Sequence, residues 1–171
     1  MKIGIVYGTR RNAATAEIVS WMTERFDELG HTVTSAKPAD FTEFDCDLYL
    51  LGTAVYAFSV KRTGLHAFIR TNRERIGAKP TAVFIVCGAD PLEPPSTDGA
   101  LKRGLKKLFL DREKYLASVT GALRTAPVST EFFKGYQESE DREKVDFESQ
   151  RGRVTEWCDA VLAKPHEPRP V

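Results

Sequence analysis

Seven residues near the N-terminus have side chains and a position that suit anion binding. They lie between an apolar run and an amphipathic pattern, and they are Thr9, Arg10, Arg11, Asn12, Ala13, Ala14 and Thr15. Asn12 is expected to cap the following helix, which leaves backbone N–H groups of its first turn free to donate to an anion. Thr9 and Thr15 add hydroxyl donors, and the two arginines add positive charge. The residues alone leave two interpretations open: a phosphate-binding loop, or an ordinary turn from strand to helix.

Two later loops combine small residues with groups that suit a flat ligand. The sequence GTAVYAF at 52–58 follows an apolar run; its small residues permit close approach, and Tyr56 could stack on a ring. Phe58 is expected to pack on the protein itself. The sequence CGADP at 87–91 also offers backbone groups, and Asp90 could accept a hydrogen bond from a ring N–H or simply form a turn before proline.

Several common sites are excluded because their residues are missing. Gly8 stands alone after the first apolar run, so neither G-x-G-x-x-G nor the Walker phosphate loop is present. No acidic residue ends that run, as a receiver domain would need, and no G-x-S-x-G nucleophile turn occurs. Cys46, Cys87 and Cys158 form no C-x-x-C pair and have no histidine at zinc-ligand spacing. We therefore predict three reduced thiols in a cytoplasmic protein and no metal site.

Composition and charge narrow the class of protein. The chain has 171 residues, 42% hydrophobic and 29% charged, with a net charge of +1. This profile is typical of one soluble domain, and no apolar run approaches the ~20 residues of a membrane span. A secretory signal is not predicted, and the charge gives no reason to expect nucleic-acid binding. Residues 59–79 hold six basic residues and one acidic residue, which usually indicates a solvated helix face.

The elements that must position these loops alternate along the chain. Apolar runs predict five strands, at Lys2–Tyr7, Thr32–Ser35, Asp47–Gly52, Thr81–Cys87 and Ala117–Leu123. Helical spacing is found at Ile18–Leu29, Leu65–Ile69, Leu101–Phe109 and Val154–Leu162, and Gly30 stands where a helix-ending glycine belongs. Trp21 and Trp157 are expected to be packing residues. Residues 88–98 and 124–139 are expected to be loops.

Alternating strands and helices favour an α/β three-layer sandwich with a five-stranded parallel sheet in strand order 2-1-3-4-5. The short, polar second strand suits an edge. A ligand of such a sheet binds beyond the carboxyl ends of the strands, near the point where the winding reverses. Loops 8–15, 53–63 and 88–98 should therefore meet. We expect one domain over 1–163 and a flexible tail over 164–171.

With these loops in place, the sequence resembles the flavodoxins. The segment from Thr9 to Thr15 is similar to their phosphate loop, Thr/Ser-x-Thr-Gly-x-Thr. The sequences GTAVYA at 52–57, GALR at 121–124 and DREKVDF…VTEWCDAVLA near the C-terminus resemble the flavodoxin-domain group that includes menaquinone-dependent protoporphyrinogen IX dehydrogenase. The likeness extends over nearly the whole chain. It implies a flavodoxin-like fold that binds FMN.

The resemblance also assigns residues to the cofactor. Residues 9–15, named above, would enclose the FMN phosphate. Bordering the isoalloxazine ring would be Thr53, Ala54, Val55, Tyr56, Ala57, Cys87, Gly88, Ala89 and Asp90. Lys61 and Arg62 would stabilise a reduced, anionic flavin and so raise its potential. No residue is assigned to acid–base catalysis.

Two departures from the family keep three functions open. The first loop has Ala13-Ala14 where the family has glycine. The segment 124–140 is shorter than in the dehydrogenases. Within it, Phe132-Phe133 could either cover a substrate or close the core. The three functions are an FMN-dependent oxidoreductase or electron-transfer protein, a quinone-dependent protoporphyrinogen IX dehydrogenase, and a scaffold that has lost FMN and binds a partner protein. The expected partner is a redox protein or a small anionic substrate, and a peripheral membrane contact stays open.

Overall fold

The computed structural model describes residues 1–10, 14–55, 59–60, 63–88, 112–135, 147–164 and 169–170. In these ranges the strands of the main sheet are β1 (Lys2–Gly8), β2 (Thr32–Ala36), β3 (Leu48–Ala54), β4 (Thr81–Cys87) and β6 (Ser129–Lys134). The helices are α1 (Ala14–Glu28), α2 (Leu65–Thr71), α3 (Arg73–Gly77), α5 (Arg112–Thr120) and α7 (Arg151–Leu162). A small second sheet pairs β5 (Thr125–Ala126) with β7 (Arg169–Pro170).

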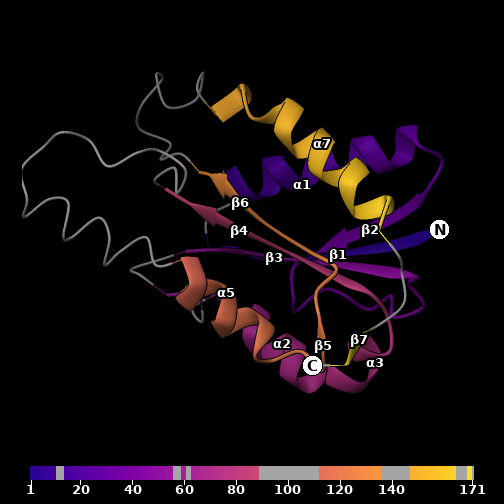
Figure 1. Ribbon diagram of the computed structural model, residues 1–171, viewed down its shortest axis with the longest axis vertical. Helices are drawn as coiled ribbons and strands as arrows, with labels where there is room; N and C mark the ends of the chain where they lie inside the picture. The colour runs from indigo at the N-terminus through magenta and orange to yellow at the C-terminus, as the bar shows by residue number, and fades with distance from the viewer. Residues whose placement is uncertain are drawn as a thin grey trace, which may run out of the picture.

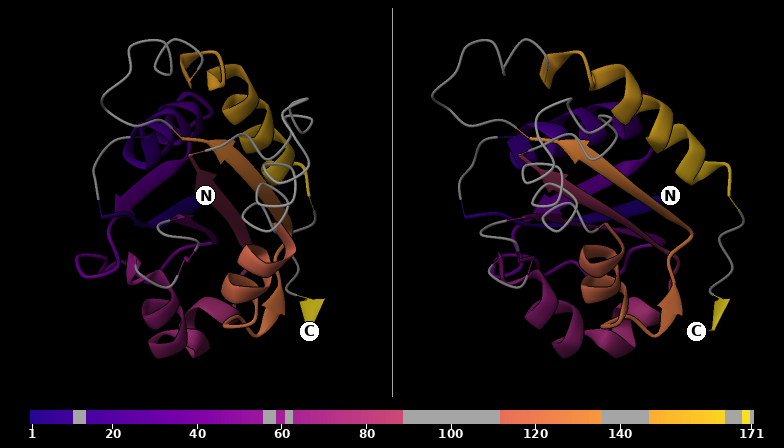
Figure 2. Two further views of the ribbon diagram at one scale, coloured as in Figure 1. Left: turned by 90° about the vertical axis from the view of Figure 1, so that its left-hand side faces the viewer. Right: turned by 60° about the vertical axis from the view of Figure 1, so that its left-hand side comes forward.

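The main sheet is parallel throughout, with strand order β2-β1-β3-β4-β6. This is the predicted winding, and β2 lies at the edge as expected. Helices α1 and α7 cover one face of the sheet, while α2, α3 and α5 cover the other (Figure 1). The two side views in Figure 2 show the same three layers. The predicted three-layer α/β sandwich is confirmed.

Each face of the sheet has its own apolar core. On the α1 side, Ile18 and Met22 pack with Trp157 of α7 over β1, β3 and β4. On the other side, Leu65 and Ile69 of α2 pack with neighbouring strand residues. Strands covered on both faces need apolar side chains at successive positions, and every residue of β3 and β4 is buried. Trp21 and Trp157 are 8% and 6% exposed, so their predicted packing role is confirmed.

The fifth strand lies later in the chain than predicted. Residues 117–123 were expected to form it, but α5 extends to Thr120 and a turn follows. Tyr115 and Val119, four residues apart, bury one helical face, so the helical period prevails over the β-branched content. The strand β6 instead occupies part of the predicted loop 124–139. The prediction failed because Glu131 and Lys134 make an edge strand look polar.

Phe132 and Phe133 lie on opposite faces of β6, since successive strand residues alternate. Phe132 belongs to the core beneath α2 and α5, and Phe133 to the core beneath α1 and α7. They are 3% and 0% exposed. The sequence left open whether the pair covers a substrate or closes the core, and this burial shows that it closes the core.

The ends of the predicted helices agree with the structure in most respects. Gly30 has φ of 78°, the left-handed conformation that ends a helix, as predicted. Leu29 was expected on the core face of α1 but is 41% exposed, because it lies beyond the helix end at Glu28. The predicted helix 101–109 and the loop 88–98 beyond Gly88 lie outside the described residues. Of the helices in the described ranges, none combines the length and apolar character needed to cross a bilayer.

Candidate functional site

Three of the predicted site segments begin at the same edge of the sheet. Because the strands are parallel, their carboxyl ends lie together, and the register pairs Gly8 with Thr53, and Ala54 with Val86. The backbone N–H of Val55 extends this edge by donating to the carbonyl of Val86 at 2.9 Å. The ends of β1, β3 and β4 are therefore neighbours, as the predicted winding requires. Helix α1 starts at this same edge of the sheet (Figure 1).

The first loop leads from β1 into α1. Thr9 is partly exposed and Arg10 exposed, whereas Ala14 and Thr15 are 6% and 3% exposed in the first turn of the helix. A helix N-terminus has backbone N–H groups without helical partners, and the helix dipole adds partial positive charge there. Arg11, Asn12 and Ala13 lie outside the described residues. Capping by Asn12 thus stays a prediction.

The loop after β3 is anchored by a pair of threonines. The Thr63 hydroxyl lies 3.0 Å from the carbonyl of Val60 and donates to it, so the hydroxyl of Thr53, 2.8 Å away, donates to Thr63 in turn. Thr53 is fully buried. Its side chain therefore holds the loop, and only its backbone would border a ligand.

Gly8 lies directly beneath this anchor. A Cβ at Gly8 would lie 2.4 Å from Thr63 Oγ1 and 2.6 Å from Thr63 Cβ. Only glycine permits this close approach, which joins the end of β1 to the loop after β3. The sequence prediction did not include Thr63, and the second threonine in the segment after β3 is the signal that could have indicated it.

The remaining residues of that loop are only partly described. Ala54 is 6% exposed, and Val55 is partly exposed at the edge of the sheet. Tyr56, Ala57 and Phe58 lie outside the described residues, as do Lys61 and Arg62. Stacking by Tyr56 and the packing of Phe58 stay predictions.

The described residues leave room beside the backbone at the end of β4. Gly88 is exposed, and a Cβ built on it would meet no atom of the described residues within 4 Å. Cys87 before it is 4% exposed, and its carbonyl accepts a hydrogen bond from the N–H of Gly135 at the end of β6. Ala89 and Asp90 lie outside the described residues. The described part of the chain thus leaves space for a ligand at Gly88, while the Cys87 side chain faces the core.

Burial raises the pKa of Cys87 to about 12, although the nearby Arg112 guanidinium acts in the opposite direction. The thiol is therefore neutral at physiological pH and is no nucleophile. Cys158 behaves alike, since burial raises its pKa to about 12.

Iodoacetamide at pH 8 should therefore alkylate the folded protein slowly. Cys46, Cys87 and Cys158 are all free and buried, and the thiolate, which is the reacting form, is scarce when the pKa is raised. Mass spectrometry over time should show three adducts only after the protein is unfolded in denaturant. Rapid labelling of Cys87 in the native protein would contradict the described burial.

A cavity of about 510 Å³ opens beside the first loop. It lies between the segment after β2 and the start of α2, and its lining residues are Thr9, Lys37, Pro38, Ala39, Asp40, Thr63, Gly64, Ala67, Phe68, Thr71 and Asn72. Of the predicted site residues that the structure describes, Thr9 alone lines it. The cavity adds Lys37 and Thr63 to the polar groups near the carboxyl edge, and neither was assigned to the site from the sequence.

Comparison with known proteins agrees with this geometry. A model of the flavodoxin domain family matches residues 5–132. A search of curated protein sequences gives no significant match.

Solved structures share the fold at low sequence identity. A point mutant of flavodoxin from Pseudomonas aeruginosa superposes with a TM-score of 0.59 and 15% identity, covering 95% of this chain and 100% of that chain. A protein assigned as a quinone reductase from Klebsiella pneumoniae has a TM-score of 0.58 and 11% identity, covering 100% and 87%. A flavone reductase superposes with a TM-score of 0.57 at 15% identity, and the match covers 98% of this chain and 66% of that chain. At these identities the likeness establishes the fold.

Proposed function

Because the chain belongs to the flavodoxin domain family, we propose that it binds FMN and acts as an oxidoreductase or electron-transfer protein. The observation that carries the proposal is the common carboxyl edge of β1, β3 and β4: the chain leaves β1 at this edge to enter α1, and at Gly88 after β4 a Cβ would meet no described atom within 4 Å. A helix N-terminus suits a phosphate, and an edge of small residues suits a flat ring.

The described residues fit this cofactor. Residues 9–15 would hold the phosphate, with Thr9 and the first turn of α1 as its described donors. Residues 53–57 and 87–90 would border the ring. Thr53 and Cys87 are buried and would contribute backbone groups, while Val55 and Gly88 have exposed surface to offer.

Bound FMN would supply the electron-transfer chemistry, and the protein would supply binding and electrostatics. Cys87 adds no negative charge beside the ring, since burial keeps its thiol protonated. The basic residues of the loop after β3 would favour the reduced cofactor. We therefore infer that the basic residues of this loop have the main influence on the redox potential of the bound flavin.

Replacing both Lys61 and Arg62 with alanine should lower the midpoint potential of the bound flavin. Two positive charges would be lost near a reduced, anionic ring, at a cost on the order of 1 kcal/mol per charge. Spectroelectrochemical titration measures the change. Arg151→Ala is the control and should leave the potential unchanged, because Arg151 of α7 pairs with Glu24 of α1 on the face of the sheet away from α2. A potential unmoved in the double variant would contradict this role.

The colour of the purified protein tests the proposal. We expect flavin absorption bands, either on purification or after FMN is added and excess removed. A colourless protein that leaves FMN fluorescence unquenched would contradict FMN binding and favour the scaffold that binds a partner protein.

A finer assignment rests on the motif GTAVYA at 52–57, which resembles the protoporphyrinogen IX dehydrogenase group. Such an activity would take an anionic substrate, as the excess of basic residues over 59–79 favours. An assay with protoporphyrinogen IX and a menaquinone analogue tests it. Flavin reoxidation by the quinone without porphyrin formation would leave the general oxidoreductase and exclude the dehydrogenase.

A further inference from the structure

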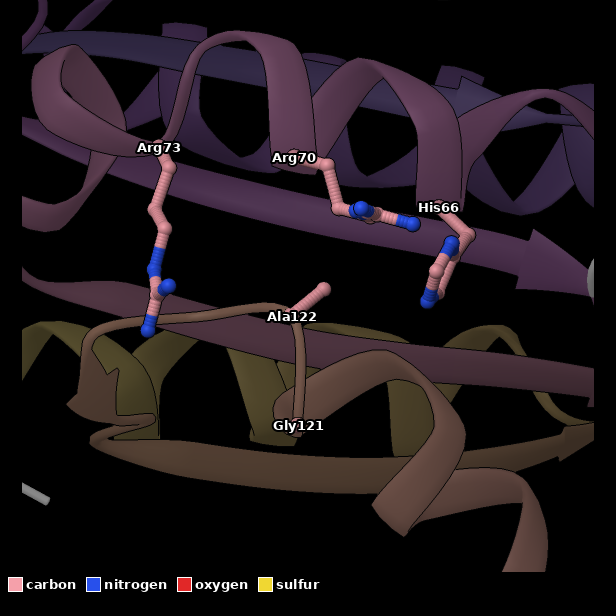
Figure 3. A pocket seen from close by; sticks show the side chains of 5 residues that line it. All are labelled: His66, Arg70, Arg73, Gly121 and Ala122. Atoms are coloured by element: carbon pink, nitrogen blue, oxygen red, sulfur yellow. The ribbon is translucent and has the colours of Figure 1, made fainter.

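A second hollow lies in the helical layer beneath the sheet. It is bounded by α2 and α3 on one side and by the turn after α5 on the other, with a volume of about 420 Å³. The side chains of His66, Arg70 and Arg73 extend from the helices toward Gly121 and Ala122 (Figure 3). The hollow takes up part of the basic stretch that the proposed flavin site does not use.

Its three nitrogen-bearing side chains come from one helical face. Residues 66, 70 and 73 are spaced by four and three positions, which places them in a row along α2 and into α3. Arg70 points toward His66, while Arg73 reaches to the far end of the hollow (Figure 3). Two arginines that share a small hollow repel one another, and a bound anion would offset this repulsion.

The arginines have no carboxylate partner in the ranges that the structure describes. Neither Arg70 nor Arg73 takes part in an ion pair there. The acid that follows them, Glu74, is already paired with Arg124. The positive charge of the hollow is therefore not balanced by the described residues around it.

The opposite wall is small and preformed. The N–H of Gly121 donates to the carbonyl of Ala117, and that of Ala122 donates to the carbonyl of Val119. A Cβ at Gly121 would lie 2.8 Å from the Ala117 carbonyl, so the turn is closely packed there. None of the described lining residues is phenylalanine, tyrosine or tryptophan, which leaves charge and hydrogen bonding as the means of recognition. Arginine guanidinium groups offer paired donors that match phosphate oxygens.

We propose that this hollow binds the phosphate group of a small molecule, either free inorganic phosphate or a phosphate monoester. The site is separate from the flavin site. Helix α2 follows β3 at the carboxyl edge and runs away from it, so Arg73 lies toward the opposite edge, shortly before β4 begins. The proposal does not depend on the flavin function, because its residues belong to another part of the surface.

Calorimetric titration of the full chain, carried out both without FMN and in the presence of saturating FMN, tests the site. Inorganic phosphate and glycerol 3-phosphate are titrated separately at constant ionic strength. The lower Kd of the two shows whether the hollow prefers free phosphate or a phosphate monoester. We expect the Kd to rise at least tenfold in Arg70→Gln/Arg73→Gln. The matched control Arg151→Gln/Lys164→Gln removes two positive charges from the region of α7 and should leave the Kd within twofold.

Three results would overturn the proposal: no binding in either arm, equal weakening in both double variants, or loss of binding on saturation with FMN. The last would place the anion in the flavin phosphate loop. NMR gives a measurement that needs no variant. The amide signals of Gly121 and Ala122 should shift on addition of phosphate, and amide shifts confined to residues 9–15 would refute the second site.

Discussion

Replacing Gly52 with alanine should lower the free energy of unfolding by about 3 kcal/mol, at the upper end of overpacking costs. Gly52 on β3 pairs in register with Phe84 on β4, and the Phe84 ring lies over it. A Cβ at Gly52 would lie 1.9 Å from Phe84 Cζ. The ring cannot move aside easily, because it is fully buried with its centroid 6.4 Å from that of Phe133 and 6.1 Å from that of Trp157.

Urea unfolding followed by circular dichroism measures this cost. Gly152→Ala is the matched control, since its Cβ would meet no atom of the described residues within 4 Å in α7. That variant should gain about 0.5–1 kcal/mol from helix propensity. In a Phe84→Leu background the Gly52→Ala cost should shrink, because the clashing ring is gone. Equal costs in both backgrounds would show that the Phe84 contact is not the cause.

Replacing Thr63 with valine should weaken FMN binding about tenfold, because the loop after β3 loses the hydrogen bonds that hold it. A tenfold change in affinity corresponds to about 1.4 kcal/mol. The variant keeps the shape of the side chain but removes the hydroxyl that bonds Val60 and Thr53. The buried Thr53 hydroxyl then keeps only longer contacts, 3.3 Å to the Ala54 carbonyl and 3.5 Å to that of Val60. Leaving such a group poorly bonded costs about 1–3 kcal/mol.

Fluorescence titration with FMN gives the affinity. Thr63→Ser retains the hydroxyl and should bind FMN with nearly the affinity of the parent protein, which separates the hydrogen bonds from the methyl group. An affinity unchanged in Thr63→Val would mean that the threonine pair does not position the loop for the cofactor.

Much of the fold could be predicted from local patterns. The buried strands β3 and β4 have continuous apolar sequences, and the apolar spacing of α1 together with Gly30 indicated a helix and its end. Strand β6 could not be found in this way, because an edge strand tolerates polar residues such as Glu131. Its place is decided by tertiary packing, in which Phe132 and Phe133 fill two separate cores.

The sequence could predict which loops start from neighbouring strand ends, whereas their role as a flavin site stays a proposal. The winding of the sheet placed residues after β1, β3 and β4 together, and the structure agrees for the residues that it describes. The sequence could not show that the Thr53 side chain is buried, since this depends on Thr63 folding back over Gly8. Nor could it show that Arg70 and Arg73 face a hollow completed by a turn much later in the chain.

Comparison of FMN with riboflavin, which lacks the phosphate, tests the central claim most directly. Both are titrated into cofactor-free protein while flavin fluorescence is followed. We expect FMN to saturate at one molecule per chain and riboflavin to bind on the order of 100-fold more weakly, because several charged hydrogen bonds at residues 9–15 and the first turn of α1 would be lost. Equal affinity for the two, or no binding of FMN, would contradict a phosphate site in this loop.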